Sequence, residues 1–132
     1  MKPLGSKITK CLNHRAKLVC IDNSGAKILR MYAVIGYKGR KNRQSKAGVG
    51  DIVMCAVFKG DPKIRDETPL AVIVRQRKEW RRPNGIRIKF EDNAAVLINE
   101  SNEPRGTMIK GAIAKEIVDR FPTIGKIASI IV

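Results

Sequence analysis

The hydrophobic residues of this chain occur in short runs, each followed by residues that favour turns. The sequence Asp22-Asn23-Ser24-Gly25 separates the first two runs, and its Asn and Gly tolerate the left-handed backbone of tight turns. Short strands separated by such turns predict a mainly β protein built on a small antiparallel barrel. The run 52–58 is wholly apolar, as expected of a strand that is buried on both faces or closes the barrel. The predicted strands lie at 18–21, 26–37, 52–58, 70–74 and 94–98.

A projecting hairpin is predicted between residues 75 and 90. Pro83-Asn84-Gly85 is a strong turn sequence, and the residues after it alternate strictly between apolar and basic. Alternating residues of a strand point to opposite faces. The apolar side of the hairpin would be formed by Ile86, Ile88 and Phe90, and its cationic side by Arg87 and Lys89.

Only the C-terminal part has a helical pattern. Apolar residues repeat there at the spacing of one face of a short helix, at Ile113, Ile117, Val118 and Phe121. Pro122 should end this helix, because the residue before a proline avoids the helical region. Residues 128–132 are expected to form a last strand or a second short turn.

The length of 132 residues fits one domain. It would comprise a basic N-terminal arm at 1–17, the barrel and hairpin at 18–111 and a C-terminal helical segment at 112–132. Three cysteines without CxxC spacing (Cys11, Cys20 and Cys55) indicate a reducing compartment rather than a disulfide framework. The chain shows no apolar leader and no run long enough to span a membrane, so we expect a soluble, cytoplasmic protein.

Positive charge dominates the composition. The chain has 27 Lys and Arg against 12 Asp and Glu, a net charge of +15. Such a surplus repels itself unless a polyanion lies against it, and nucleic acid is the usual polyanion. An anionic membrane is the alternative. The first 50 residues contain a single acid, Asp22, so this part of the chain is the more strongly cationic.

Two clusters of cations are candidates for contact with RNA phosphates. The first could be merely a solvated loop, but its glycines let the backbone approach a partner, and the net charge favours phosphate contact. The second lies on the predicted hairpin and is opposed only by Glu79. The first cluster is Lys38, Arg40, Lys41, Arg43 and Lys46, and the second is Arg75, Arg77, Lys78, Arg81, Arg82, Arg87 and Lys89.

Aromatic residues make up only 5% of the chain. A sheet that reads single-stranded RNA usually displays several stacking rings, so this scarcity favours recognition of folded RNA through its backbone and shape. Trp80 lies inside the second cluster. It could stack on a base or ribose, or equally cover the apolar side of the hairpin.

Residues suited to catalysis or metal binding are scarce. The only histidine is His14, and with Cys11 it forms at most half of a zinc site, without a second half. Glu91 and Asp92 are adjacent in a predicted turn and form no obvious acid–base pair. We therefore expect no catalytic residues, no metal and no cofactor. An enzyme acting on RNA would need a clustered acid–base or metal set.

Several motifs occur in an order typical of one family. Ala71-Val72-Ile73-Val74 is followed after nine residues by Asn84-Gly85, and then by Phe90, Asn93, Val96 and Leu97. The other motifs are Asp22-Asn23-Ser24-Gly25-Ala26, Gly48-Val49-Gly50-Asp51, Glu103-Pro104-Arg105-Gly106-Thr107 and Ile109-Lys110-Gly111. From Leu18 to Val132 the chain resembles the universal large-subunit ribosomal protein family numbered fourteen (L-fourteen), in its archaeal and eukaryotic form. One departure is Ala112, where many members carry proline, at the entry to the C-terminal helix.

The resemblance implies a five-stranded barrel with small C-terminal helices that binds large-subunit rRNA, with Arg105 among the contacts. It implies a bridge to small-subunit rRNA, contacts with neighbouring large-subunit ribosomal proteins, docking of the anti-association initiation factor six, and no membrane. From the residues alone, the apolar C-terminal end could pack on the barrel or dock against a protein; the resemblance favours docking. The implied partner surface is Ile113, Lys115, Ile117, Arg120, Phe121, Ile127 and Ile131.

The function predicted is therefore that of a structural constituent of the large ribosomal subunit. Its Lys and Arg side chains would neutralise phosphates and release counterions, while RNA shape would supply specificity. The alternative is a free barrel-type RNA-binding translation factor, which the two cationic clusters fit equally well.

Overall fold

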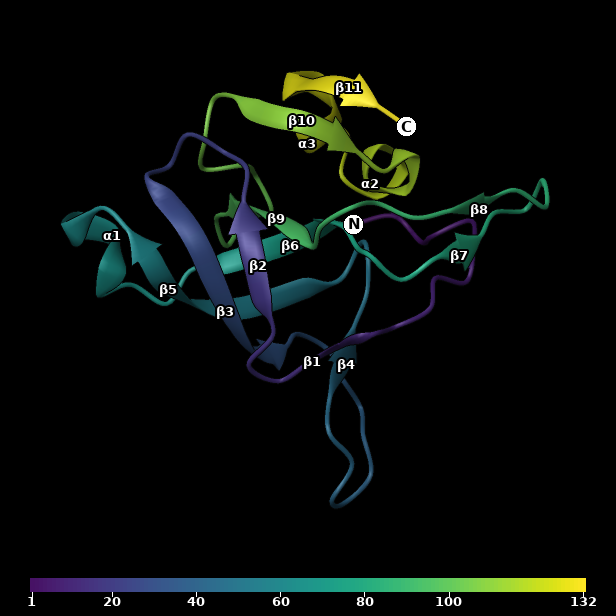
Figure 1. The fold of residues 1–132 in the computed structure, drawn as a ribbon, viewed down its shortest axis with the longest axis horizontal. Helices are drawn as coiled ribbons and strands as arrows, with labels where there is room; N and C mark the ends of the chain where they lie inside the picture. Colours follow the sequence, from purple (N-terminus) through teal and green to yellow (C-terminus); the bar gives the residue numbers. More distant parts are fainter.

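The computed structural model describes the whole chain, residues 1–132, and its centre is a closed barrel of five strands (Figure 1). Neighbouring strands of the barrel are antiparallel, except at the seam between β2 and β9, where they are parallel. The predicted five-stranded barrel is confirmed. In order around the barrel, its strands are β2 (Lys17–Cys20), β3 (Ala26–Val34), β5 (Ile52–Gly60), β6 (Leu70–Arg75) and β9 (Ala94–Ile98).

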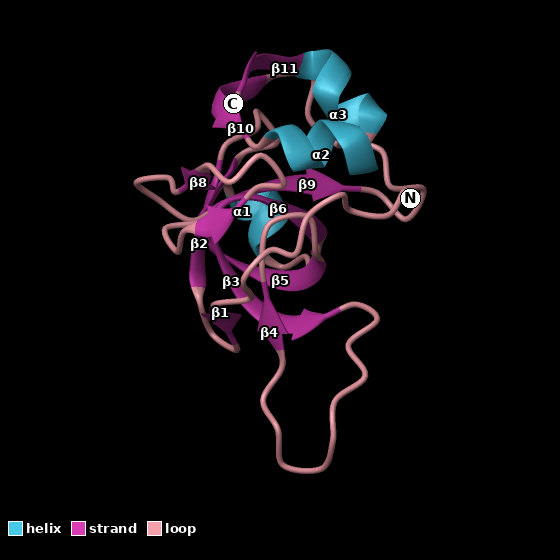
Figure 2. Ribbon diagram, turned by 90° about the vertical axis from the view of Figure 1, so that its right-hand side faces the viewer, coloured by secondary structure: helices cyan, strands magenta, loops and turns pink.

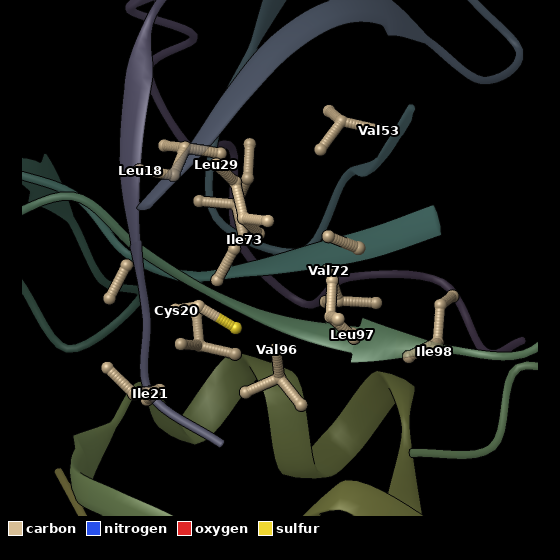
Figure 3. Packing of buried hydrophobic residues seen from close by; sticks show 14 of the residues in the cluster. Leu18, Cys20, Ile21, Leu29, Val53, Val72, Ile73, Val96, Leu97 and Ile98 are labelled. Atoms are coloured by element: carbon tan, nitrogen blue, oxygen red, sulfur yellow. The ribbon is translucent and has the colours of Figure 1, made fainter. Parts of the chain in front are cut away.

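The interior of the barrel is filled by every second side chain of its strands. Burial alternates along β2, so that Leu18 and Cys20 point inward. Leu29 of β3 is the register partner of Leu18, and both lie close to Ile73 of β6 (Figure 3). In β5 burial also alternates, which decides the prediction for 52–58: this strand closes the barrel and is not buried on both faces.

Strands β6 and β9 are the ones buried on both faces, because the C-terminal segment covers their outer side. No residue of β9 is exposed. Val96 of β9 points toward the C-terminal helices (Figure 3), and its register partner Val72 of β6 shares that face. Two-sided burial explains why both strands are continuous apolar runs. The C-terminal layer consists of β10 (Ile109–Ile113), α2 (Lys115–Arg120), α3 (Pro122–Ile127) and β11 (Ala128–Ile131).

The predicted C-terminal helix is correct in its end but wrong in its start. Ile113 is the last residue of β10, and α2 begins two residues later. Ile113 and Ile117 have the spacing of one helix face, but they share that pattern because a strand and a helix bury them in the same core. Pro122 ends α2 as expected and is also the first residue of α3, where a missing N–H costs nothing. The last residues form a strand, β11, which pairs parallel with β10.

The remaining elements are short. Strand β1 pairs with β4, so the end of the N-terminal arm is packed on the barrel, with Ile8 and Leu12 buried. The predicted hairpin is present and projects from the barrel (Figure 1). None of the helices has the length and apolar character needed to cross a membrane. These elements are β1 (Leu12–Asn13), β4 (Lys46–Ala47), α1 (Pro62–Arg65), β7 (Trp80–Arg81) and β8 (Arg87–Ile88).

Candidate nucleic-acid interface

The β3–β4 loop, residues 35–45, extends far from the barrel, on the side opposite the C-terminal layer (Figures 1 and 2). It leaves β3 through Gly36, whose φ of 75° lies in the left-handed region that suits glycine. The hydroxyl of Tyr37 donates to the carbonyl of Gln44 at 3.2 Å and so ties the two sides of the loop together. The first cationic cluster lies on this loop and the first residue of β4. Its members are all exposed and form no salt bridge: Lys38, Arg40, Lys41, Arg43 and Lys46.

A buried glutamine connects the chain just after this loop to the hairpin. The Gln76 side-chain oxygen accepts from the backbone N–H of Val49 at 3.0 Å. Its amide donates to the carbonyl of Thr9 in the arm at 3.0 Å and to that of Lys78 at 2.9 Å. Because Gln76 is fully buried, these bonds are shielded from water and hold the three segments in fixed register. Sequence reasoning missed this residue, since nothing marks a polar residue after a strand as buried.

Trp80, at the base of the hairpin, is part of the core. Only 1% of its surface is exposed, and its ring stacks on Phe90 with centroids 5.9 Å apart. Its indole N–H donates to Glu116 Oε1 at 3.0 Å. Of the two roles open from sequence, Trp80 therefore covers the apolar side of the hairpin, and it is not available to stack on a base.

Arg82 is also held within the protein. Its Nε and Nη2 donate to the two carboxylate oxygens of Glu116 at 2.9 and 3.1 Å, a bidentate pair. Nη2 also donates to the carbonyl of Val132 at 2.6 Å, and only 15% of the side chain is exposed. The Trp80–Arg82–Glu116 network thus joins the hairpin to the first turn of α2 and to the end of the chain.

Glu116 is charged at the centre of this network. The residue is only 6% exposed, and burial by itself would raise the pKa of its carboxyl. The hydrogen bonds from Arg82 and Trp80 outweigh that effect, so the pKa lies below its usual value. Glu116 was not singled out from sequence, because its partners on the hairpin are 36 and 34 residues away.

Two further cations of the predicted set have partners inside the protein. Arg75 forms a salt bridge to Asp92 at 2.9 Å and donates to the carbonyl of Ala112 at 3.2 Å. The hydrogen bond to Ala112 anchors the end of β10 to the barrel, at the residue that departs from the family pattern. Arg105 pairs with Glu67 at 2.6 Å; that hydrogen bond raises the pKa of Arg105 and lowers that of Glu67.

The rest of the second cluster faces solvent. Arg87 lies 3.4 Å from Glu79, and both side chains are well exposed, so this pair is weak. The other four cations are exposed and form no salt bridge. The hairpin and the β3–β4 loop thus present free positive charge suited to phosphate on two separate projections of the barrel (Figure 1). These four are Arg77, Lys78, Arg81 and Lys89.

Comparison with known proteins fits this basic barrel. The sequence model described as ribosomal protein L14p/L23e matches residues 11–132. The chain belongs to the ribosomal protein L14p/L23e family. Relatives named large ribosomal subunit protein uL14 align over 132 residues, 100% of this chain and of theirs: 50% identical in Methanocorpusculum labreanum and Halorubrum lacusprofundi, and 48% in Methanoregula boonei. The resemblance to this family in its archaeal form is confirmed.

Several residues of the partner surface predicted from the sequence are buried within the chain. Ile113, Ile117 and Phe121 lie inside the protein's own core, where they support the C-terminal layer. Ile127 and Arg120 are partly buried, and the latter lies against the ring of Phe121. Of the predicted surface, Lys115 and Ile131 remain exposed, and Ile131 lies beside Ile130 and Val132, which are 54% and 44% exposed.

The cysteines of this L14p/L23e chain are free thiols, of which Cys20 and Cys55 are buried and Cys11 is partly buried. Burial raises the pKa of Cys20 and of Cys55 to about 12, and for Cys20 the nearby Asp22 adds to the effect. Burial also raises the pKa of Cys11. Thiols with such pKa values are poor nucleophiles at neutral pH. His14 is exposed, with Nδ1 2.8 Å from the carbonyl oxygen of Tyr32.

Proposed function

We propose that this protein is a structural constituent of the large ribosomal subunit that binds large-subunit rRNA. Membership of the L14p/L23e family and the names of its relatives support the assignment to the subunit. The observation that supports rRNA binding is the β3–β4 loop, which carries exposed cations without an acidic partner. Its role would be architectural rather than catalytic.

The contacts we assign to rRNA are the five cations of the first cluster and the exposed members of the second. Arg75, Arg82 and Arg105 have acidic partners within the chain, so their part in binding would be to hold the interface in shape. Both basic regions are fixed to the barrel through Gln76. A rigid pair of cationic projections recognises a folded RNA by the spacing of its phosphates rather than by its bases.

The finer roles follow from the family resemblance. We propose that the protein contributes to a bridge with small-subunit rRNA and contacts neighbouring large-subunit proteins. We further propose that the anti-association initiation factor six docks on the C-terminal layer. The exposed apolar end of β11 supports a protein partner there, because such side chains are stabilised when they are covered. The protein would accordingly be found on cytoplasmic ribosomes.

Sedimentation of cell lysate through a sucrose gradient tests the proposal. The protein should migrate with large subunits and whole ribosomes at about one copy per particle, and it should remain there after a wash in moderate salt. Migration at the top of the gradient, or release by slight increases in salt, would favour a translation factor that cycles on and off. Release of the protein from the particles when the cations of the β3–β4 loop are replaced by neutral residues would locate the interface.

A further inference from the structure

The charged residues on the wall of the barrel formed by β2, β3 and β5 are all cations. These three strands contain Lys17, Lys27, Arg30 and Lys59 and not one acidic residue. None of the four cations forms a salt bridge. The strands lie away from the β7–β8 hairpin (Figure 1), so this wall is separate from that part of the interface already described.

An exposed aromatic ring lies on this wall. Phe58 of β5 is 42% exposed and points outward from the barrel. The ammonium of Lys17 lies 4.7 Å from the centre of its ring, and the guanidinium carbon of Arg30 lies 4.6 Å from it. Lys17 and Arg30 are register partners on β2 and β3, so the backbone itself brings them to the same ring.

This arrangement holds two like charges close together. Since each lies within 5 Å of the same ring centre, they are at most about 9 Å apart, close to the screening length of physiological salt. The face of the ring attracts each cation and fixes its side chain, although the charges repel each other. An anion between or beside them would remove that repulsion, and the entropy of ordering both side chains has already been lost.

We propose that Lys17, Arg30 and Phe58 form a further RNA-binding site, in which the two cations bind the phosphates of one strand and the ring contacts the adjoining sugar. This inference rests on the proposed rRNA-binding function. RNA fits better than a protein partner because every charged side chain of these three strands is positive, with no acidic group to pair with a protein's cations. Binding here and at the loops would mean that RNA encloses the barrel from more than one side.

The salt dependence of binding to large-subunit rRNA tests this site. The double variant Lys17→Gln/Arg30→Gln should reduce the slope of log K against log salt by roughly 0.7–0.9 for each phosphate that is no longer neutralised. The matched control is Lys110→Gln/Lys126→Gln, which removes the same charge from the C-terminal layer. A slope equal to that of the control, with loop variants still reducing theirs, would overturn this inference and leave the proposed function standing. If the loop variants also had no effect, the proposed function would fail.

The ring is tested separately by Phe58→Leu. This variant keeps both cations but no longer fixes them, so affinity should fall by about two- to fivefold while the salt slope stays unchanged. A photoreactive benzoylphenylalanine in place of Phe58, incorporated into large subunits, identifies the neighbour directly. A crosslink that ribonuclease digests supports the proposal, whereas a crosslink to another protein contradicts it and shows that this wall meets a protein.

Discussion

The β3–β4 loop and the β7–β8 hairpin are both rich in Lys and Arg, but they differ in how many of these cations pair with acidic residues of the chain. Every cation of the first cluster is exposed and has no acidic partner. In the second cluster, Arg75 and Arg82 are held by Asp92 and Glu116, and Arg87 lies beside Glu79. The loop therefore presents most of its charge to a partner, whereas the hairpin uses part of its charge to fix its own position.

This difference shows that a basic stretch of sequence does not reveal how much of its charge is available. The acid that neutralises Arg82 comes from helix α2, 34 residues later in the chain. Removing one member of a buried bidentate pair destabilises the protein, because the charge that remains has neither a partner nor water around it. The hairpin should therefore respond to mutation mainly through stability, and the loop mainly through RNA affinity.

The largest effect is expected from Glu116→Ala. This change leaves the Arg82 guanidinium and the Trp80 N–H without their acceptor in a largely buried place. We expect the free energy of unfolding to fall by about 3 kcal/mol, at the lower end for a buried pair that loses one member, since Arg82 retains some solvent exposure. Equilibrium unfolding in urea measures this change in the free energy of unfolding. Asp119→Ala, an exposed acid on the same helix, is the control and should change stability by less than about 0.5 kcal/mol. Equal decreases in both variants would show that the network contributes nothing specific.

The next largest effect should come from the loop. Replacing Arg40, Lys41 and Arg43 together by Gln should reduce the salt slope of rRNA binding by roughly 2 to 3 units, because each phosphate left without its cation lowers the slope by about 0.7–0.9. Stability should change little, since these side chains face solvent only. Filter binding at several salt concentrations measures the slope. An unchanged slope would mean that the loop does not face RNA.

A finer test separates two adjacent arginines of the hairpin. Arg81 is exposed and has no salt-bridge partner, whereas Arg82 is paired with Glu116. Arg81→Gln should reduce the salt slope by roughly 0.7–0.9, the value for one phosphate, and leave the free energy of unfolding unchanged within about 0.5 kcal/mol. Arg82→Gln should do the reverse, lowering stability while the slope of the folded protein stays the same. If both variants reduced only RNA affinity, the two arginines would not have the separate roles proposed for them.

The strands, the hairpin and the helix boundary that were predicted correctly depend on local sequence patterns. Alternation and turn residues located the barrel strands and the hairpin, because these depend on neighbours within a few positions. Pro122 marked a helix boundary for the same reason. The free cations of the β3–β4 loop also followed from local composition, since no acid lies within that stretch.

What the sequence did not predict depends on contacts between distant segments. Gln76 and Glu116 are buried and bonded to residues that only the folded chain brings near. Phe58 looked like one more apolar residue of a strand, although it lies on the outside of the barrel in contact with two cations. Ile113, Ile117 and Phe121 were assigned to a partner surface because an apolar helix face has the same pattern whether its own core or another protein covers it.

The smallest effect concerns pH and again distinguishes the hairpin from the loop. The pKa of Glu116 is lower in the folded protein than the value of about 4.3 expected when unfolded, so the unfolded chain takes up a proton first as pH falls. The stabilisation from Glu116 should be complete above about pH 5 and should be lost as pH falls through the folded pKa. The measurement is the free energy of unfolding of the protein and of Glu116→Gln between pH 7 and pH 3. The difference between the two free energies of unfolding should be constant at higher pH and shrink below about pH 4.5, each unit of pKa depression corresponding to about 1.4 kcal/mol.

Other acids, such as Glu67, titrate alike in both proteins, so their contributions cancel in this difference. The β3–β4 loop contains no carboxylate, so variants of its cations should follow the unmodified protein across this range. A difference that grows as pH falls would show that Glu116 is less acidic in the folded protein, and that burial rather than Arg82 determines its charge.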